Sequence, residues 1–144
     1  MKHRLIFLFT GILSALNCAA FFGSYDDVGL SLKCIEKEGR LKLNFINVGT
    51  SKSSLFAPCL TNTLIQVKDE SSNEVQPKVL LRQNCDTHLF DLPENDTATF
   101  FYPYTLAEMY DLKNGKTYKI KVEYYIYCKG KVTRKIVADC EVSW

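Results

Sequence analysis

Two stretches near the C-terminus decide the fold. Tyr118–Cys128 reads Tyr-Lys-Ile-Lys-Val-Glu-Tyr-Tyr-Ile-Tyr-Cys, and residues 134–144 read Arg-Lys-Ile-Val-Ala-Asp-Cys-Glu-Val-Ser-Trp. In both, apolar and polar side chains alternate, so each stretch has one face for a core and one for water. A short connection that contains Gly130 separates them. This arrangement predicts an antiparallel hairpin.

Alternation also restricts how the two strands pair. A hairpin must bring the apolar sets to the same face, and a slip of one residue would bury lysines. Two loop lengths satisfy this condition. A five-residue loop pairs Ile126 with Ile136, and a three-residue loop pairs Tyr124 with Ile136.

The rest of the chain repeats the pattern at short spacing. Period-two runs occur at 28–34 and 41–45, and further strand candidates are 63–68, 74–82 and 97–102. Only residues 104–112 have a helix-like spacing, and no helical period extends over twelve residues after the first twenty. About seven short strands in one domain predict an all-β, antiparallel sandwich.

The first twenty residues have the three parts of a secretory signal peptide. Lys2, His3 and Arg4 form a positive start, residues 5–16 carry no charge, and Cys18-Ala19-Ala20 ends the stretch with small residues. The apolar run is shorter than the ~20 residues that a membrane span needs. We expect cleavage after Ala20, which leaves domain 21–144 in a secreted, extracellular protein (in a bacterium, in the periplasm or cell envelope). The alternatives are an uncleaved anchor and acylation of Cys18.

Removing residues 1–20 changes the charge. The whole chain has 18 basic and 16 acidic residues, and Lys2 and Arg4 leave with the signal, so the mature chain is neutral. Residues 21–112 hold 8 basic and 13 acidic side chains, and residues 113–144 hold 8 and 3. The basic end is either a surface for an anionic partner or a solvated strand face that keeps edges from pairing. We expect no nucleic-acid partner.

Five cysteines remain after cleavage: Cys34, Cys59, Cys85, Cys128 and Cys140. An odd number allows two bridges and leaves one thiol, which is either buried and inert or links two chains into a dimer. In both hairpin registers Cys128 and Cys140 are about six residues apart, or ~20 Å, well beyond the ~4.4–6.8 Å of a disulfide. We therefore predict a strand bridge from Cys34 to Cys140 or Cys128, and a loop bridge from Cys59 to Cys85.

Residues for catalysis are scarce. His88 is the one histidine after position 20, and neither a zinc-ligand spacing nor a nucleophile or phosphate-loop motif is present. Cys85 and His88 are three residues apart, but loop residues of this kind are more often structural. An acidic stretch lacks the regular spacing of calcium ligands and reads as a solvated loop (Asp86, Asp91, Glu94 and Asp96). We expect no enzyme activity, no metal and no cofactor.

Two surface features remain. Asn95-Asp96-Thr97 fits the N-glycosylation acceptor pattern. Tyr125 and Tyr127 fall on the outward face of their strand together with Lys119 and Lys121. Because tyrosine is enriched at interfaces, this mixed face is a candidate binding surface. The alternative is that the tyrosines pack against a neighbouring loop.

One segment resembles a known family. Residues 109–122, Met-Tyr-Asp-Leu-Lys-Asn-Gly-Lys-Thr-Tyr-Lys-Ile-Lys-Val, resemble the corner before the penultimate strand of immunoglobulin-like and fibronectin-like sandwiches. Tyr118 occupies the place of the tyrosine that bonds back to the loop. The order of features over 41–122 is similar to the immunoglobulin-like pro-region of deuterolysin-type zinc peptidases and to small bacterial proteinase-inhibitor sandwiches.

The resemblance implies an immunoglobulin-like sandwich that is directed at a protease, as an inhibitor or a pro-domain-like module. The residues themselves favour a secreted, non-enzymatic protein that binds another protein. The competing interpretation is a secreted structural, surface or host-interaction protein without a small-molecule ligand.

Overall fold

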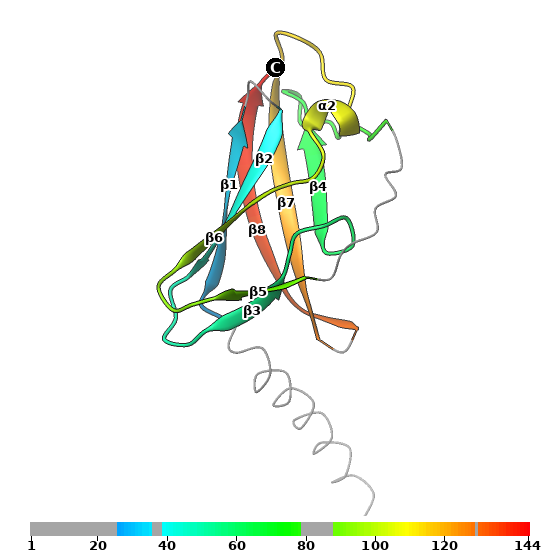
Figure 1. The fold of residues 1–144 in the computed structure, drawn as a ribbon. Helices are drawn as coiled ribbons and strands as arrows, with labels where there is room; N and C mark the ends of the chain where they lie inside the picture. Colours follow the sequence, from blue (N-terminus) through cyan, green and yellow to red (C-terminus); the bar gives the residue numbers. More distant parts are fainter. Residues whose placement is uncertain (1–25, 36–38, 79–87, 129) are drawn as a thin grey trace, which may run out of the picture.

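A computed structural model describes residues 26–35, 39–78, 88–128 and 130–144. This part of the chain folds into eight strands and one short helix (Figure 1). The strands are β1 (Val28–Ile35), β2 (Arg40–Asn47), β3 (Ser53–Phe56), β4 (Thr63–Lys68), β5 (Leu89–Leu92), β6 (Thr97–Phe101), β7 (Thr117–Cys128) and β8 (Lys131–Ser143), and the helix is α2 (Leu106–Met109). The predicted signal peptide lies outside the described residues.

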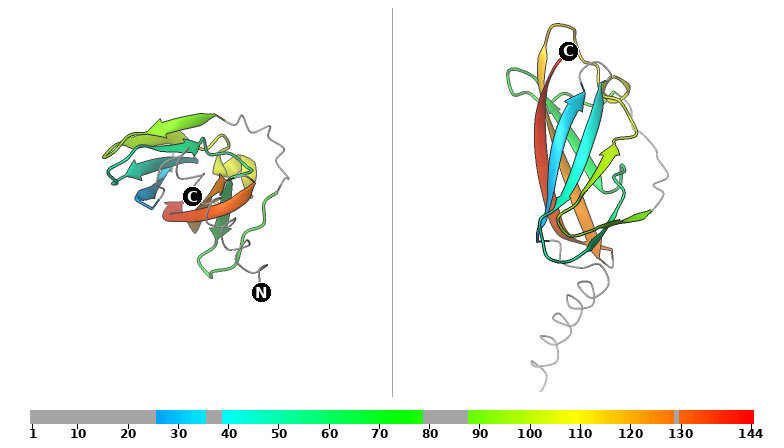
Figure 2. Two further views of the ribbon diagram at one scale, coloured as in Figure 1. Left: turned by 90° about the horizontal axis from the view of Figure 1, so that it is seen from below. Right: turned by 60° about the vertical axis from the view of Figure 1, so that its left-hand side comes forward.

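The strands form three antiparallel sheets. One has the order β1-β2-β6, a second has the order β4-β7-β8, and β3 pairs with β5 in a third. The two three-stranded sheets lie one in front of the other, and the β3-β5 sheet lies across their lower end (Figures 1 and 2). The predicted all-β, antiparallel class is confirmed.

One predicted strand needs correction, and two short strands were missed. Residues 74–78 form isolated bridges at Glu74 and Pro77 rather than a strand, and residues 79–82 lie outside the described part. Pro77 has no N–H to donate to a ladder, which is a physical reason for the irregularity. The four-residue strands β3 and β5 were not predicted. The helix-like stretch is a single turn at α2, capped reciprocally by Thr105 and Glu108.

The C-terminal hairpin takes one of the two predicted registers. Tyr124 pairs with Ile136 and Ile126 pairs with Arg134, as the three-residue loop requires, so the five-residue alternative is wrong. A bulge between Ile126 and Tyr127 then shifts the pairing by one residue, and the ladder reaches Cys128 opposite Lys131. The Thr133 hydroxyl donates to the Ile126 carbonyl at 3.0 Å, so the carbonyl keeps a partner at the bulge.

The core lies between the two larger sheets. Phe45 of β2 is fully buried, and its ring centroid is 4.8 Å from that of Tyr124 and 5.9 Å from that of Phe100. The inward rows of β2 and β7 alternate with exposed or half-buried residues along each strand, except that the outward Glu123 of β7 is also buried. The alternation of apolar and polar residues in the sequence therefore corresponds to the alternation of buried and exposed side chains in β2 and β7.

A disulfide joins the first and last strands. Cys34 in β1 is bonded to Cys140 in β8, with a Cα–Cα distance of 6.0 Å, which confirms the predicted strand bridge and the prediction that Cys128 and Cys140 do not pair. Cys59 and Cys128 are each in a disulfide as well. None of the four described cysteines is therefore a free thiol. Cys85 lies outside the described residues, and the Cys59–Cys85 bridge stays a prediction.

The start of β7 contains the expected tyrosine bond. The Tyr118 side chain is buried, and its hydroxyl oxygen accepts a hydrogen bond from the Lys113 N–H at 3.0 Å. The bond spans the turn at Gly115, which has a positive φ of 76°. Tyr118 thus ties the loop to the strand that follows it.

Candidate functional site

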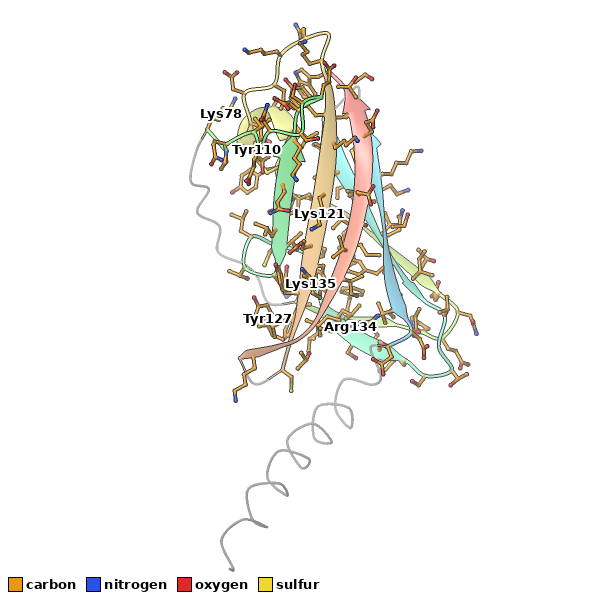
Figure 3. The ribbon with its side chains drawn as sticks, turned by 180° about the vertical axis from the view of Figure 1, so that it is seen from behind. Lys78, Tyr110, Lys121, Tyr127, Arg134 and Lys135 are labelled. Atoms are coloured by element: carbon orange, nitrogen blue, oxygen red, sulfur yellow. A yellow bond between two sulfur atoms is a disulfide. The ribbon has the colours of Figure 1, made fainter. Side chains whose placement is uncertain are left out.

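The outer face of the β4-β7-β8 sheet holds the predicted binding residues. We call it the outer β7 face, and define it by Leu64, Lys119, Lys121, Glu123, Tyr125, Tyr127, Lys135 and Val137. Figure 3 shows this side of the molecule, with Lys121, Lys135 and Tyr127 following one another towards the hairpin end. The face exists because odd-numbered residues of β7 point away from the core.

Glu123 is the centre of this face. Its carboxylate accepts from the Tyr125 hydroxyl at 2.6 Å and forms ion pairs with Lys121 at 2.7 Å and Lys135 at 3.3 Å. These neighbours cover it, and its side chain is 8% exposed, whereas both lysine side chains are 47% exposed. The hydrogen bond from Lys121, followed by that from Tyr125, lowers the pKa of Glu123 to about 2.

Glu123 also changes the pKa of Tyr125. Because the Tyr125 hydroxyl donates to this carboxylate, the pKa of Tyr125 is raised above its ordinary value. The result is a network of one carboxylate, two ammonium groups and one phenol on the surface of the sheet. Its lysines are the groups with free surface, and a carboxylate from another molecule can replace water on them.

Two exposed apolar side chains flank the charged centre. Leu64 of β4 and Val137 of β8 lie opposite Glu123 on either side, so the three residues form one row across the sheet. Leu64 is 44% exposed and Val137 is 42% exposed. Charged and exposed apolar side chains therefore lie next to one another on this face.

The two predicted tyrosines are more enclosed than a free surface would make them. Both are half-buried. The Tyr125 N–H donates to the Asn62 carbonyl at 2.7 Å, and the Tyr127 hydroxyl lies 3.4 Å from the Thr61 carbonyl. The Tyr127 side chain therefore contacts the loop of residues 57–62, whereas the backbone bond of Tyr125 continues the β4-β7 ladder. Lys119 and Lys121 are exposed.

Asn62 holds that loop in place, and no sequence pattern had pointed to it. Its buried side-chain amide donates to the Ala57 carbonyl at 3.0 Å and accepts from the Cys59 N–H at 2.8 Å. The Thr63 hydroxyl donates to the same oxygen at 2.8 Å. A loop held in this way gives the tyrosines a rigid neighbour.

The other predicted site residues are not brought together. His88 is exposed, and Asp91 is engaged with Lys52 at 2.9 Å and with the Ser54 hydroxyl at 2.7 Å. Cys85 and Asp86 lie outside the described residues. In the described ranges no group of histidine, cysteine or acidic side chains is arranged to hold a metal ion.

Asn95 lies in the turn between β5 and β6. Its φ is 55°, a left-handed conformation that asparagine tolerates, and the residue is exposed. The acceptor asparagine is thus accessible, and its glycosylation stays a prediction.

A polar hollow of about 260 Å³ lies near the turn before β7. Its lining includes Asp69, Glu70, Lys116 and Tyr118. These groups are engaged with their own surroundings: the Asp69 carboxylate accepts from the Ser71 and Asn73 N–H groups, and Glu70 pairs with Lys116 at 3.6 Å. These contacts tie part of the lining of the hollow to the loops around it.

No protein-family model matches the chain, and a search of curated proteins finds no significant match. In the part of the chain that the structure describes, no helix has both the length and the apolar character that crossing a bilayer requires.

Proposed function

We propose that this chain is a secreted, non-enzymatic protein-binding module of the immunoglobulin-like kind, and that it binds through the outer β7 face. The observation that carries the proposal is the row of Leu64, Glu123 and Val137 with its flanking lysines. This row has exposed apolar side chains next to two lysines whose ammonium groups are held by the Glu123 carboxylate. A partner surface with acidic groups beside apolar side chains fits this pattern.

The strand arrangement supports the immunoglobulin-like part of the proposal. In such sandwiches, the first two strands share one sheet with a later strand, and the last two strands form the other sheet with a middle one. The orders β1-β2-β6 and β4-β7-β8 follow this division. The bond between Tyr118 and Lys113 is similar to the tyrosine corner that this fold family has before its penultimate strand, and this similarity supports the proposal.

The resemblance to pro-regions and proteinase inhibitors supports a peptidase as the class of protein that this chain binds. An inhibitor of this kind forms a stoichiometric complex. The first experiment therefore titrates a panel of secreted peptidases with the protein and follows residual activity. A linear loss of activity that ends at equimolar protein supports the protease-directed version, and an unaffected panel overturns that version alone.

The second experiment tests the face. The protein is used as bait for affinity capture from its native medium, and bound partners are identified by cross-linking and mass spectrometry. The variants Lys121→Ala and Val137→Ser are used as bait in parallel. The matched control is Lys33→Ala, an exposed lysine of β1 in the opposite sheet. We expect the partner to be lost with the two face variants and kept with the control. Equal capture by all three variants would overturn the assignment of the face.

A further inference from the structure

The β1-β2-β6 sheet differs from the other large sheet in its charges. Its three strands contain three basic residues and no acidic one, whereas β7 and β8 contain Glu123, Asp139 and Glu141. The three basic residues belong to a part of the chain that is acidic overall, since residues 21–112 hold 8 basic and 13 acidic side chains. Positive charge is therefore concentrated on one sheet of an acidic region.

Two of the basic residues, Lys33 and Lys42, are neighbours on the outer side of this sheet. They are direct partners in the β1-β2 ladder, and the alternating burial along β2 directs Lys42 away from the core. Like charges at opposed positions repel each other. Neither lysine side chain has an ion-pair or hydrogen-bond partner in the described part of the chain. The third basic residue, Arg40, interacts electrostatically with Glu108 and is not part of this pair.

The acidic residues that precede β1 and β6 lie at the other end of the sheet. Asp27 comes six residues before Lys33, and Asp96 comes five residues before Phe101. These separations correspond to ~20 Å and ~16 Å along the strands. Both exceed the Debye length of ~8 Å at physiological salt, so these two carboxylates do not neutralise the lysine pair. Residues 36–38, which connect β1 to β2, lie outside the described residues.

An exposed aromatic ring continues the row of lysines. Phe101 is the direct partner of Lys42 in the β2-β6 ladder, so the row across the sheet is Lys33, Lys42 and Phe101. Because the Tyr102 N–H donates to the Leu41 carbonyl, the adjacent pair of Lys42 and Phe101 is a non-hydrogen-bonded pair. Opposed side chains lie closest together in such a pair. The Phe101 residue is 52% exposed.

The next row on the same face consists of uncharged polar groups. Ser31, Asn44 and Thr99 are opposed across the three strands, ~6.6 Å along the strands from the row of lysines. The Thr99 hydroxyl donates to the Asn44 side-chain oxygen at 2.8 Å. This bond leaves the NH2 group of Asn44 and the hydroxyl of Ser31 without a partner among the described residues.

Cations, neutral hydrogen-bonding groups and an aromatic ring on one face match the chemistry of a charged sugar. A sulfate group accepts charge-assisted hydrogen bonds from lysine ammonium groups. The C–H groups of a sugar ring carry a slight positive charge and pack on the negative face of an aromatic ring. Sugar hydroxyls donate and accept, as serine and asparagine side chains also do.

We infer that this face is a binding site for a sulfated polysaccharide. We call it the outer β2 face and define it by Lys33, Lys42, Phe101, Ser31 and Asn44. Sulfate groups bind between the two lysines, a sugar ring packs on Phe101, and ring hydroxyls reach the neutral row. An acidic peptide also carries charge for the lysines, but it has no sugar ring for Phe101.

The inference does not depend on the proposed function. The outer β2 face and the outer β7 face belong to different sheets on opposite sides of the molecule, which Figures 1 and 3 show from the front and from behind. Variants of one face should therefore leave binding at the other unchanged, so each proposal can fail without the other.

The test measures the dissociation constant of a heparin octasaccharide by titration calorimetry at physiological salt. The full chain with its disulfides formed is compared with the double variant Lys33→Gln/Lys42→Gln. We expect the double variant to bind about tenfold more weakly or worse, because it loses charge-assisted hydrogen bonds. Lys119→Gln removes the same charge from an exposed lysine of the opposite sheet and should keep the affinity. No binding by the unmodified protein, or an equal loss with Lys119→Gln, would overturn the inference.

Two variants of Phe101 test the contact with the sugar ring. Phe101→Tyr keeps the aromatic ring and should bind as the unmodified protein does. Phe101→Leu keeps an apolar side chain but removes the ring, and it should weaken binding about threefold or more. Polyglutamate of the same total charge as the octasaccharide should bind more weakly than the octasaccharide. Equal affinities of the two Phe101 variants, or equal binding of polyglutamate, would assign the face to anions in general and overturn the inference.

Discussion

Tyr124 and Tyr125 are neighbours in β7, but they point to opposite faces of the sheet. Tyr124 is 1% exposed, packs edge-on against Phe45, and donates its hydroxyl to the Phe56 carbonyl at 2.6 Å. Tyr125 is half-buried and donates its hydroxyl to the Glu123 carboxylate.

The two hydroxyls show how the faces differ. The inner one is paired with a backbone carbonyl of another sheet, so its bond is part of the fold. The outer one is paired with a side chain that also holds two exposed lysines, and such a network can rearrange when another molecule binds. Residue type alone does not distinguish a structural tyrosine from a surface one. The face of the sheet to which the side chain points does distinguish them.

The largest effect is expected from truncating the inner residue. Tyr124→Ala should lower the free energy of unfolding by about 3–5 kcal/mol, because it removes a buried aromatic ring and leaves a cavity. Tyr125→Ala is the matched control and should cost about 1 kcal/mol or less. Denaturant unfolding of both variants measures the difference. Equal losses would show that the two faces do not differ as described.

The second-largest effect is expected from removing the disulfide between β1 and β8. Replacing both Cys34 and Cys140 with alanine removes a bridge between residues 106 positions apart, and should lower the free energy of unfolding by about 2–4 kcal/mol. The same unfolding experiment measures it. The variant Ser31→Ala, at an exposed position of β1 three residues before Cys34, provides a reference with little change. A double variant as stable as the unmodified protein would contradict the role given to the bridge.

A smaller loss is expected at the corner. Tyr118→Phe keeps the buried ring and removes the oxygen that accepts from the Lys113 N–H, so it should cost about 1 kcal/mol. On the outer face, Tyr127→Phe removes a hydroxyl whose contact with Thr61 is 3.4 Å long, and its stability should be nearly unchanged. Thermal unfolding of the two variants gives the comparison, and the reverse order would contradict it.

The smallest effect concerns Glu123 and acid. Its pKa falls from 4.5 to about 2 on folding, so the ionised form stabilises the native state fully above pH 4.5. That contribution is lost as the pH falls through about 2. Because both lysine partners are half exposed, solvent screening reduces this contribution well below the value that the full pKa shift would give. Glu123→Gln should therefore flatten the decline in stability over this range, and a parallel decline would contradict the assignment.

The sequence predicted the parts of the fold that depend on long alternation. The apolar rows of β7 and β8 are long enough that parity left two registers, and the structure has one of them. The bulge at Thr133 could not be predicted, because an extra polar residue beside a polar loop leaves the pattern unchanged.

Short and side-chain-dependent features were beyond the sequence. Residues 53–56 and 89–92 contain too few residues to show a period, and they become strands by pairing with each other across the chain. For the candidate site, alternation placed Glu123 on the outer face. Its enclosure depends on Lys135, which lies in the next strand, and on lysine rotamers that no pattern specifies.

The bridge from β1 to β8 has a consequence for the order of biosynthesis. A chain is made from its N-terminus, so Cys34 leaves the ribosome 106 residues ahead of Cys140. Cys59 follows much sooner, and any oxidation of Cys34 during that interval joins it to the wrong partner. Correct closure of the sandwich therefore has to wait until β8 has been synthesised, and the yield of native protein depends on how quickly early disulfides are reshuffled.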